Sequence, residues 1–157
     1  MFTYRHRVRY HEADQQGFLF NSRYLEIADT AMAEYFRELG WRYAELNDLG
    51  VDPSVVRVEA TFSSPARFED DLDAEVQCVR VGRTSFQLRT VVSCGSRQIA
   101  VLDLTYVNVD AVSAVSAPLP AEIAEALRWD APSRAHQVET SGHRTVGEPA
   151  MTTRQKR

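Results

Sequence analysis

Residues 22–39 have the apolar spacing of a long helix, and the fold must be built around this one segment. Apolar and small side chains recur there every three or four residues, which gathers them into one wide stripe. Asn21 or Ser22 is a suitable N-cap for the helix. Gly40 is a suitable stop, because glycine readily adopts the left-handed conformation that ends many helices.

The segments around this helix alternate apolar and polar side chains, which is the period of half-buried strands. Five strands are therefore expected, over residues 2–12, 55–63, 72–78, 85–94 and 98–109. Shorter helices are expected over residues 41–50 and 121–129.

Two glycine-containing pairs, Gly82-Arg83 and Gly95-Ser96, are expected to form two-residue hairpin turns between the last three strands. With the first turn in that place, Cys78 would face Gln87. A disulfide between Cys78 and Cys94 is then not expected. Two reduced thiols are typical of a cytoplasmic protein.

A single long helix followed by a run of antiparallel strands is an α+β layout. A five-stranded antiparallel sheet wrapped around such a helix is the hotdog fold. One helix leaves the far face and an edge of the sheet to be covered, and association of copies is the usual solution. A homodimer or homotetramer is therefore expected.

The chain of 157 residues is long enough for one domain with a sizeable core, expected over residues 1–132. Residues 133–157 are polar, with five basic and two acidic residues, and are expected to form a disordered tail. The formal charge of −4 argues against nucleic acid as a partner, because phosphate binding needs a basic surface. No apolar run approaches the about 20 residues of a membrane span, and no signal peptide is expected.

Several common kinds of site are missing from the sequence. It has no glycine-rich phosphate loop and no GxSxG nucleophile motif. Its four histidines do not have the spacing of zinc ligands. Neither a cofactor nor a metal is therefore expected.

The segment from Asp14 to Asn21 is the part of the sequence that is best suited to carry out a chemical reaction. Asp14 follows a strand, and Asn21 stands seven residues later at the start of the long helix. A helix N-terminus offers free backbone N–H groups, which can polarise a thioester carbonyl and hold its oxyanion. A nearby carboxylate could act as a base on water or as a nucleophile. The pattern by itself also fits Asp14 as a loop or capping residue.

The end of this loop, Phe18-Leu19-Phe20, is unusually apolar. Exposed apolar loop residues are often covered by a ligand or by a partner chain. We therefore expect these three side chains to be covered by substrate or by a second copy.

The same segment resembles the active-site motif of hotdog-fold thioesterases of the 4-hydroxybenzoyl-CoA thioesterase type. The Tol-Pal-associated acyl-CoA thioesterases belong to that group. The matching residues are Asp14-Gln15-Gln16-Gly17, then Phe18-Leu19-Phe20, then Arg23-Tyr24-Leu25. The resemblance continues through residues 63–88 and covers roughly residues 4–110.

The resemblance implies a role for individual residues. Asp14 matches the catalytic carboxylate, and the backbone amide of Asn21 matches the oxyanion donor. Arg83 falls in a turn that meets the phosphates of CoA in the hydroxybenzoyl-CoA enzyme. The remaining residues implied in substrate binding are Gly17, Phe18, Phe20 and Tyr24.

The sequence departs from the family pattern at two places. The acyl-CoA branch often has His where this chain has Asn21, and the turn around Arg83 lacks a run of cations. A substrate on an acyl-carrier protein therefore stays open beside acyl-CoA. The alternative to a thioester hydrolase is a non-catalytic hotdog module that binds an acyl chain or a partner.

Overall fold

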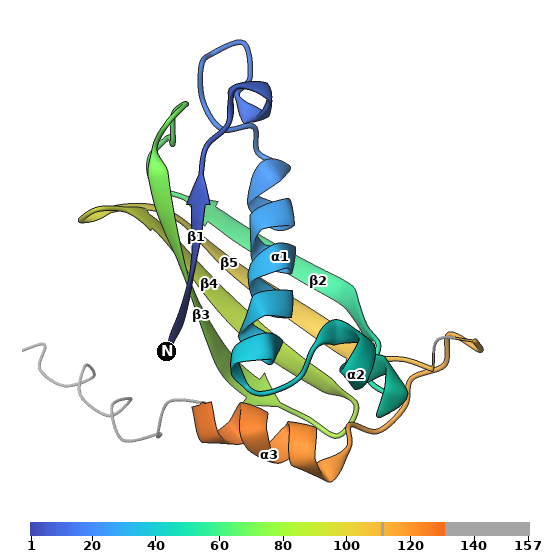
Figure 1. The fold of residues 1–157 in the computed structure, drawn as a ribbon. Coiled ribbons are helices and arrows are strands. Elements are labelled where there is room, and N and C mark those ends of the chain that lie inside the picture. Colours follow the sequence, from blue (N-terminus) through green and yellow to red (C-terminus); the bar gives the residue numbers. More distant parts are fainter. Residues whose placement is uncertain (111, 131–157) are drawn as a thin grey trace, which may run out of the picture.

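A five-stranded antiparallel sheet wraps around one long helix in the computed structural model, which describes residues 1–110 and 112–130 (Figure 1). The elements are β1 (Phe2–Arg7), the 3₁₀ helix η1 (Tyr10–Glu12), α1 (Arg23–Glu38), α2 (Tyr43–Asp48), β2 (Pro53–Phe62), β3 (Asp71–Val81), β4 (Ser85–Cys94), β5 (Arg97–Asn108) and α3 (Ala121–Asp130). The strand order is β1-β3-β4-β5-β2, and all pairs are antiparallel. The predicted α+β arrangement is confirmed, and the predicted tail over 133–157 lies outside the described residues.

Helix α1 packs its predicted apolar stripe against the sheet. Seven of its side chains are buried: Tyr24, Ile27, Ala28, Ala31, Met32, Tyr35 and Phe36. Small residues at 28 and 31 let the helix backbone lie close to the strands. Ser22 stands at the N-cap position, but its side chain makes no capping hydrogen bond, contrary to the expectation from sequence.

An aromatic cluster joins this helix to the middle of the sheet. The Phe36 ring meets Phe86 of β4 edge-on at 5.6 Å, and Phe86 stacks on Tyr106 of β5 at 5.1 Å. All three rings are at most 1% exposed. Full burial of each such ring contributes about 1.5–3 kcal/mol, so the cluster fixes α1 firmly on the sheet.

The β3–β4 hairpin differs by one residue from the expected one. Gly82 N–H donates to Ser85 O at 2.7 Å, so Arg83 and Thr84 form the turn instead of Gly82-Arg83. Gly82 does not have the positive φ that the first position of the expected turn requires. Because a bulge in β3 shifts the register again, Cys78 pairs with Leu88 and not with Gln87.

The second hairpin is as expected. Cys94 pairs with Arg97 across Gly95-Ser96, and Gly95 has a φ of +58°. Both Cys78 and Cys94 are free thiols, as predicted. Burial raises the pKa of Cys78 to about 11, so this thiol is unreactive at neutral pH.

Strand β1 is shorter than the expected strand over residues 2–12. It ends at Arg7, and the chain then turns into η1. In a strand over residues 2–12, alternation would place Tyr10 on the same side as Val8, but Tyr10 is 83% exposed while Val8 is buried. The turn is stabilised by Glu12, whose backbone N–H donates to Arg9 O at 3.0 Å.

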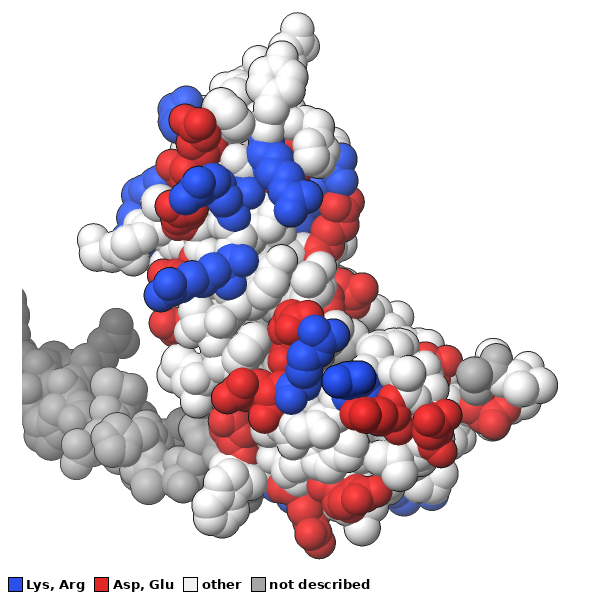
Figure 2. All heavy atoms as spheres, in the orientation of Figure 1, with Lys and Arg blue, Asp and Glu red and all other residues white. Residues whose placement is uncertain are grey.

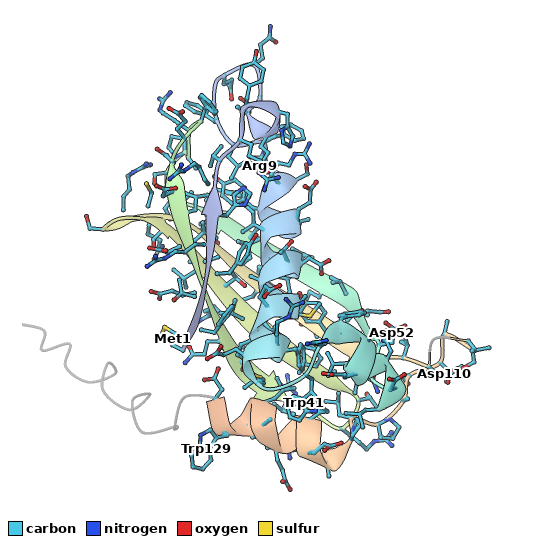
Figure 3. The ribbon with its side chains drawn as sticks, viewed as in Figure 1. Met1, Arg9, Trp41, Asp52, Asp110 and Trp129 are labelled. Carbon is cyan, nitrogen blue, oxygen red and sulfur yellow. The ribbon has the colours of Figure 1, made fainter. Side chains whose placement is uncertain are left out.

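Helix α3 closes the end of the sheet opposite to η1 (Figure 3). It buries Ile123, Ala124 and Leu127, while Trp129 points outward and is 93% exposed. Together with α2, it confirms the two short helices expected from sequence. None of the helices in the described part of the chain is long and apolar enough to cross a membrane.

Candidate active site

The candidate loop is a tight hairpin between η1 and α1. Ala13 and Leu19 form a bridge, and Asp14 N–H donates to Phe18 O at 2.8 Å. Gly17 N–H closes the turn on Asp14 O at 2.9 Å. Gly17 has a φ of +75°, where a side chain would be strained. The glycine therefore contributes to the site through its backbone conformation.

The Asp14 carboxylate is held in place by its own turn. Its Oδ1 atom accepts the N–H of Gln16 at 2.8 Å and that of Phe18 at 3.1 Å. Its Oδ2 atom makes no hydrogen bond to any residue that the structure describes. One carboxylate oxygen is thus fixed, and the other can receive a proton or attack a carbon.

The Asn21 backbone N–H lies at the start of α1. Two other amides at this end are used, since Arg23 N–H donates to Phe20 O at 2.8 Å and Leu25 N–H to Ser22 O at 3.1 Å, whereas the N–H groups of Ser22 and Tyr24 have no acceptor among the described residues. Within residues 1–110 and 112–130, the Asn21 N–H has no acceptor. The helix dipole adds positive potential at this end.

Asp14 and Asn21 lie on one continuous segment. Asp14 is opposite Phe18 in the hairpin, and Asn21 follows Phe18 by three residues. Three residues of extended chain span about 10 Å and the step across the hairpin adds about 5 Å, so the two backbones are at most about 15 Å apart.

The three apolar loop residues have different surroundings. Leu19 is 2% exposed, and its N–H donates to Ala66 O at 2.8 Å, so its own chain covers it. Phe18 is half-buried beneath the Arg67 guanidinium, which lies 4.7 Å from the ring centroid. Phe20 is 51% exposed. The expectation that a ligand or partner covers all three is therefore wrong for Leu19.

Tyr24 lies under the site and not on its surface. It is 3% exposed, and its ring meets Phe62 of β2 edge-on at 5.1 Å. Burial raises the pKa of Tyr24, so the hydroxyl is neutral at physiological pH. In the isolated chain this residue supports the first turn of α1.

Arg83 is far from Asp14 in the same chain. It is exposed in the β3–β4 turn, where its carbonyl accepts the N–H of Leu119 just before α3. The loop of Asp14 lies at the opposite end of β3 (Figure 1). The 11 residues of β3 span about 30 Å, so one protomer does not bring these two residues together.

Two features near Asp14 were missed by the sequence analysis. His6 and Glu12 form a buried contact at 2.9 Å, and Arg67 stacks on Phe18. Alternation along the strand places His6 on the same side as Tyr4 and Val8, but no local pattern identifies Glu12 as its partner. Arg67 is 49 residues from Phe18 in the sequence, so its contact depends on the fold.

Charge is unevenly distributed over the visible face. Arginine side chains gather around η1 and the start of α1, whereas acidic side chains are more numerous around α2 and α3 (Figure 2). A cavity of about 310 Å³ lies between β1, η1 and the start of α1. Among the described residues, no cluster of three or more His, Cys, Asp or Glu side chains is placed to hold a metal ion.

The fold and the loop geometry define a hotdog-fold protein. Residues 8–127 match the model of the thioesterase-like superfamily, and the chain therefore belongs to that superfamily. A protein of Aquifex aeolicus named "Putative esterase" is 24% identical over 127 residues, which are 81% of this chain and 98% of that protein.

Solved structures agree with this assignment. A gentisyl-coenzyme A thioesterase aligns with a TM-score of 0.73 and 25% identity, over 80% of this chain and 98% of that one. A 1,4-dihydroxy-2-naphthoyl-CoA thioesterase from Synechocystis aligns with a TM-score of 0.73 and 18% identity, over 81% and 95% of the two chains. At this low identity, the second alignment shows the fold alone.

Proposed function

We propose that this protein hydrolyses an acyl thioester carried by CoA or by an acyl-carrier protein. One observation carries the proposal: a single hairpin holds the anchored Asp14 carboxylate and a free N–H at a helix start. Membership of the thioesterase-like superfamily supports it. The match to Asp14, Gly17 and the start of α1 favours the 4-hydroxybenzoyl-CoA and Tol-Pal-associated group within that superfamily.

The reaction needs two functions from the hairpin. The Asn21 N–H donates to the thioester oxygen and stabilises the negative charge that develops there. Asp14 Oδ2 either takes a proton from the attacking water or attacks the carbonyl carbon itself. In the second route, water then hydrolyses the anhydride. Both routes break the C–S bond and give a carboxylic acid and a thiol, and both need Asp14 unprotonated.

The acyl group would lie against the aromatic side chains at the hairpin. Phe18 and Phe20 are the partly exposed ones, whereas Tyr24 is buried against Phe62. The structural relative at 25% identity is named for an aromatic acyl-CoA substrate. We therefore include aromatic acyl groups among the substrates proposed for this chain.

The proposed active form is a homodimer or homotetramer. Strand β2 is at the edge of the sheet, and its apolar side chains Val55, Val56, Val58 and Phe62 are 42–60% exposed. Pairing of β2 with a second copy would cover them. Arg83 could meet the phosphates of the thiol carrier only if a second copy brings its own β3–β4 turn to the site.

The alternative is a module that binds an acyl chain without turnover. One observation favours it, because Asp14 Oδ1 already has a structural role in bonding two amides of the turn. We place either form in the cytoplasm, which the free thiols of Cys78 and Cys94 support.

A substrate panel with a matched variant separates the two functions. Purified protein is mixed with aliphatic and aromatic acyl-CoA thioesters and with an acylated carrier protein, and the released thiol is measured. Asp14→Asn is the control, because its amide oxygen can still accept both turn hydrogen bonds. Thiol release by the wild type that Asp14→Asn lacks supports hydrolysis. Substrate binding without release would support the module instead.

A further inference from the structure

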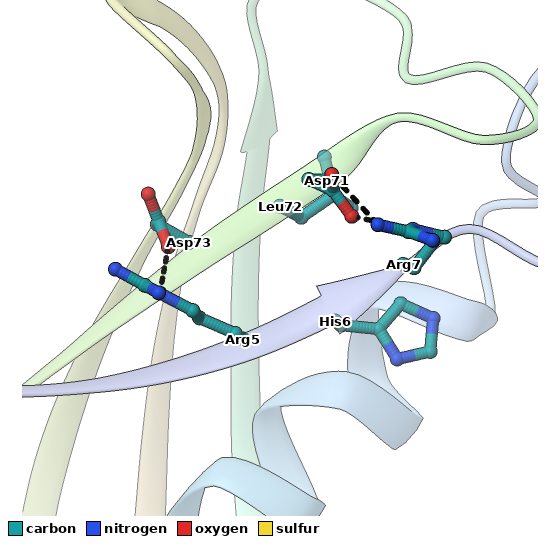
Figure 4. Close-up of a pocket in the computed structure, with 6 residues that line it drawn as sticks. All are labelled: Arg5, His6, Arg7, Asp71, Leu72 and Asp73. Carbon is teal, nitrogen blue, oxygen red and sulfur yellow. Dashed lines mark hydrogen bonds and ion pairs between the residues drawn. The ribbon is translucent and has the colours of Figure 1, made fainter.

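A buried polar contact connects β1 to the loop that carries Asp14. His6 Nε2 lies 2.9 Å from Glu12 Oε2, and both side chains are only 9% exposed. His6 points to the side of β1 that faces α1 (Figure 4). The ion pairs that Arg5 and Arg7 make with β3 lie on the other side of the strand. The contact is therefore separate from the pairs that hold the sheet edge together.

Glu12 is held by both its side chain and its backbone. Its Oε2 atom also accepts the N–H of Arg9 at 2.7 Å, and its carbonyl accepts the N–H of Phe20 at 2.9 Å. Burial acts to raise the pKa of Glu12, but the hydrogen bonds from Arg9 and His6 outweigh it and lower the pKa below its ordinary value. The carboxylate therefore stays charged at neutral pH.

The Glu12–Phe20 hydrogen bond closes the open end of the candidate hairpin. Asp14 follows Glu12 by two residues, and Asn21 follows Phe20 directly. A displacement of Glu12 would therefore move the carboxylate and the N–H donor relative to each other. A shift of about 1 Å in such a geometry can lower a rate by about 100-fold.

We propose that the His6–Glu12 pair is a positioning device that holds Asp14 and the Asn21 N–H at the separation needed for thioester hydrolysis. This inference rests on the function proposed above. His6 and Glu12 do not themselves touch the substrate in this account. Their effect reaches the reaction through the backbone of the hairpin.

Other charged groups of η1 and α1 also face the pair. The cavity beside it is also lined by Arg9, Arg23 and Glu26, together with Tyr4. Arg23 and Glu26 pair with each other at 2.7 Å on the first turn of α1. No second carboxylate within the described residues is paired with His6.

Two substitutions of His6 test the contact without opening a large cavity. The amide nitrogen of His6→Gln can reach the position of Nε2, whereas the shorter His6→Asn cannot. His6→Asn should lower kcat by about 10- to 100-fold with KM within about threefold, and His6→Gln should restore most of kcat. Arg5→Ala, which removes a pair from the other side of β1, is the matched control and should leave kcat unchanged.

Amide hydrogen exchange gives a readout that does not depend on catalysis. In His6→Asn, the Phe20 amide should exchange at least about tenfold faster, while amides in the centre of β4 keep their protection. His6→Gln should exchange like the wild type.

The two measurements keep this inference distinct from the proposed function. Wild-type kcat and wild-type Phe20 protection in His6→Asn would overturn the positioning role. A loss of kcat with unchanged Phe20 protection, or an equal loss in His6→Gln, would also overturn it. If the wild type hydrolyses no thioester, the proposed function fails and with it the catalytic purpose of the pair. Faster Phe20 exchange would then show only that the pair holds the hairpin.

Discussion

Replacing Asp14 by Asn and by Ala separates the chemical role of this residue from its structural one. The Asn amide oxygen keeps an acceptor for the N–H groups of Gln16 and Phe18, which now lie 2.8 and 3.1 Å from Oδ1. Ala leaves both amides without that acceptor. Neither substitution keeps a carboxylate that can act as a base or nucleophile.

The expected magnitudes follow from these contacts. A hydrogen bond of this kind contributes about 0.5–1.5 kcal/mol net, so Asp14→Ala should lower the free energy of unfolding by about 1–3 kcal/mol. Asp14→Asn should lower it by less than about 1 kcal/mol. Thioester hydrolysis should fall at least about 100-fold in both variants, because both lack the carboxylate.

Urea unfolding followed by circular dichroism measures the stability, at one protein concentration because association would shift the midpoint. Thiol release under saturating substrate measures kcat. Activity of Asp14→Asn within a few-fold of the wild type would refute the catalytic role. An Asp14→Ala variant as stable as Asp14→Asn would refute the structural role assigned to Oδ1.

Four further outcomes are expected. Asn21→Ala keeps the backbone N–H and should change kcat only a few-fold, whereas Asn21→Pro deletes the donor and should lower kcat about 100- to 1,000-fold. Thermal melts check that both variants are folded. An equal loss of kcat in the two variants would contradict a backbone donor. Val56→Lys adds a charge to the apolar edge of β2, where Val56 is 60% exposed, and should yield monomers in sedimentation velocity; an unchanged dimer or tetramer would exclude β2 as the contact. Arg83→Ala should raise KM for acyl-CoA at low salt but not KM for a truncated pantetheine thioester, with kcat unchanged in steady-state assays; an equal rise for both would rule out phosphate binding. The pKa of Glu12 is lowered from the ordinary 4.5, so the stability that the charged carboxylate contributes is present above about pH 4.5 and is lost as the pH falls further. In urea unfolding at pH 6 and pH 3.5, the Glu12→Gln variant should therefore lose less stability on acidification than the wild type. Equal losses in the two proteins would contradict this.

The sequence predicted best the elements whose pattern is local. Helix α1 was predicted from its apolar spacing alone, because the extent of the apolar stripe gives the length of the helix and its position gives the buried face. The β3–β4 register was missed by one residue, because the turn lies at Arg83-Thr84 and a bulge between Cys78 and Arg80 shifts the pairing once more. The early end of β1 was also missed. Glu12 bonds the Arg9 N–H with its side chain, and such local bonds compete with strand pairing.

Contacts between distant segments could not be predicted from local patterns. Leu19 reads as an exposed apolar loop residue, but Ala66 and the core cover it within the same chain. The Arg67 guanidinium over Phe18 depends on the same approach of the two segments. In each case the sequence shows the apolar residue but not what covers it.

Asn21 and Arg83 are placed very differently relative to Asp14. Asp14 and Asn21 belong to one hairpin and one helix start, so backbone hydrogen bonds alone fix their separation. Arg83 is about 30 Å away along β3, so its role requires a second copy of the chain. Mixing Asp14→Asn with Arg83→Ala protein tests this requirement directly. If a site uses Asp14 of one copy and Arg83 of another, a mixed dimer contains one intact site, and low-salt activity at subsaturating acyl-CoA should rise above that of either variant alone. No gain in dimers shown to have mixed would leave Arg83 as a solvated turn residue.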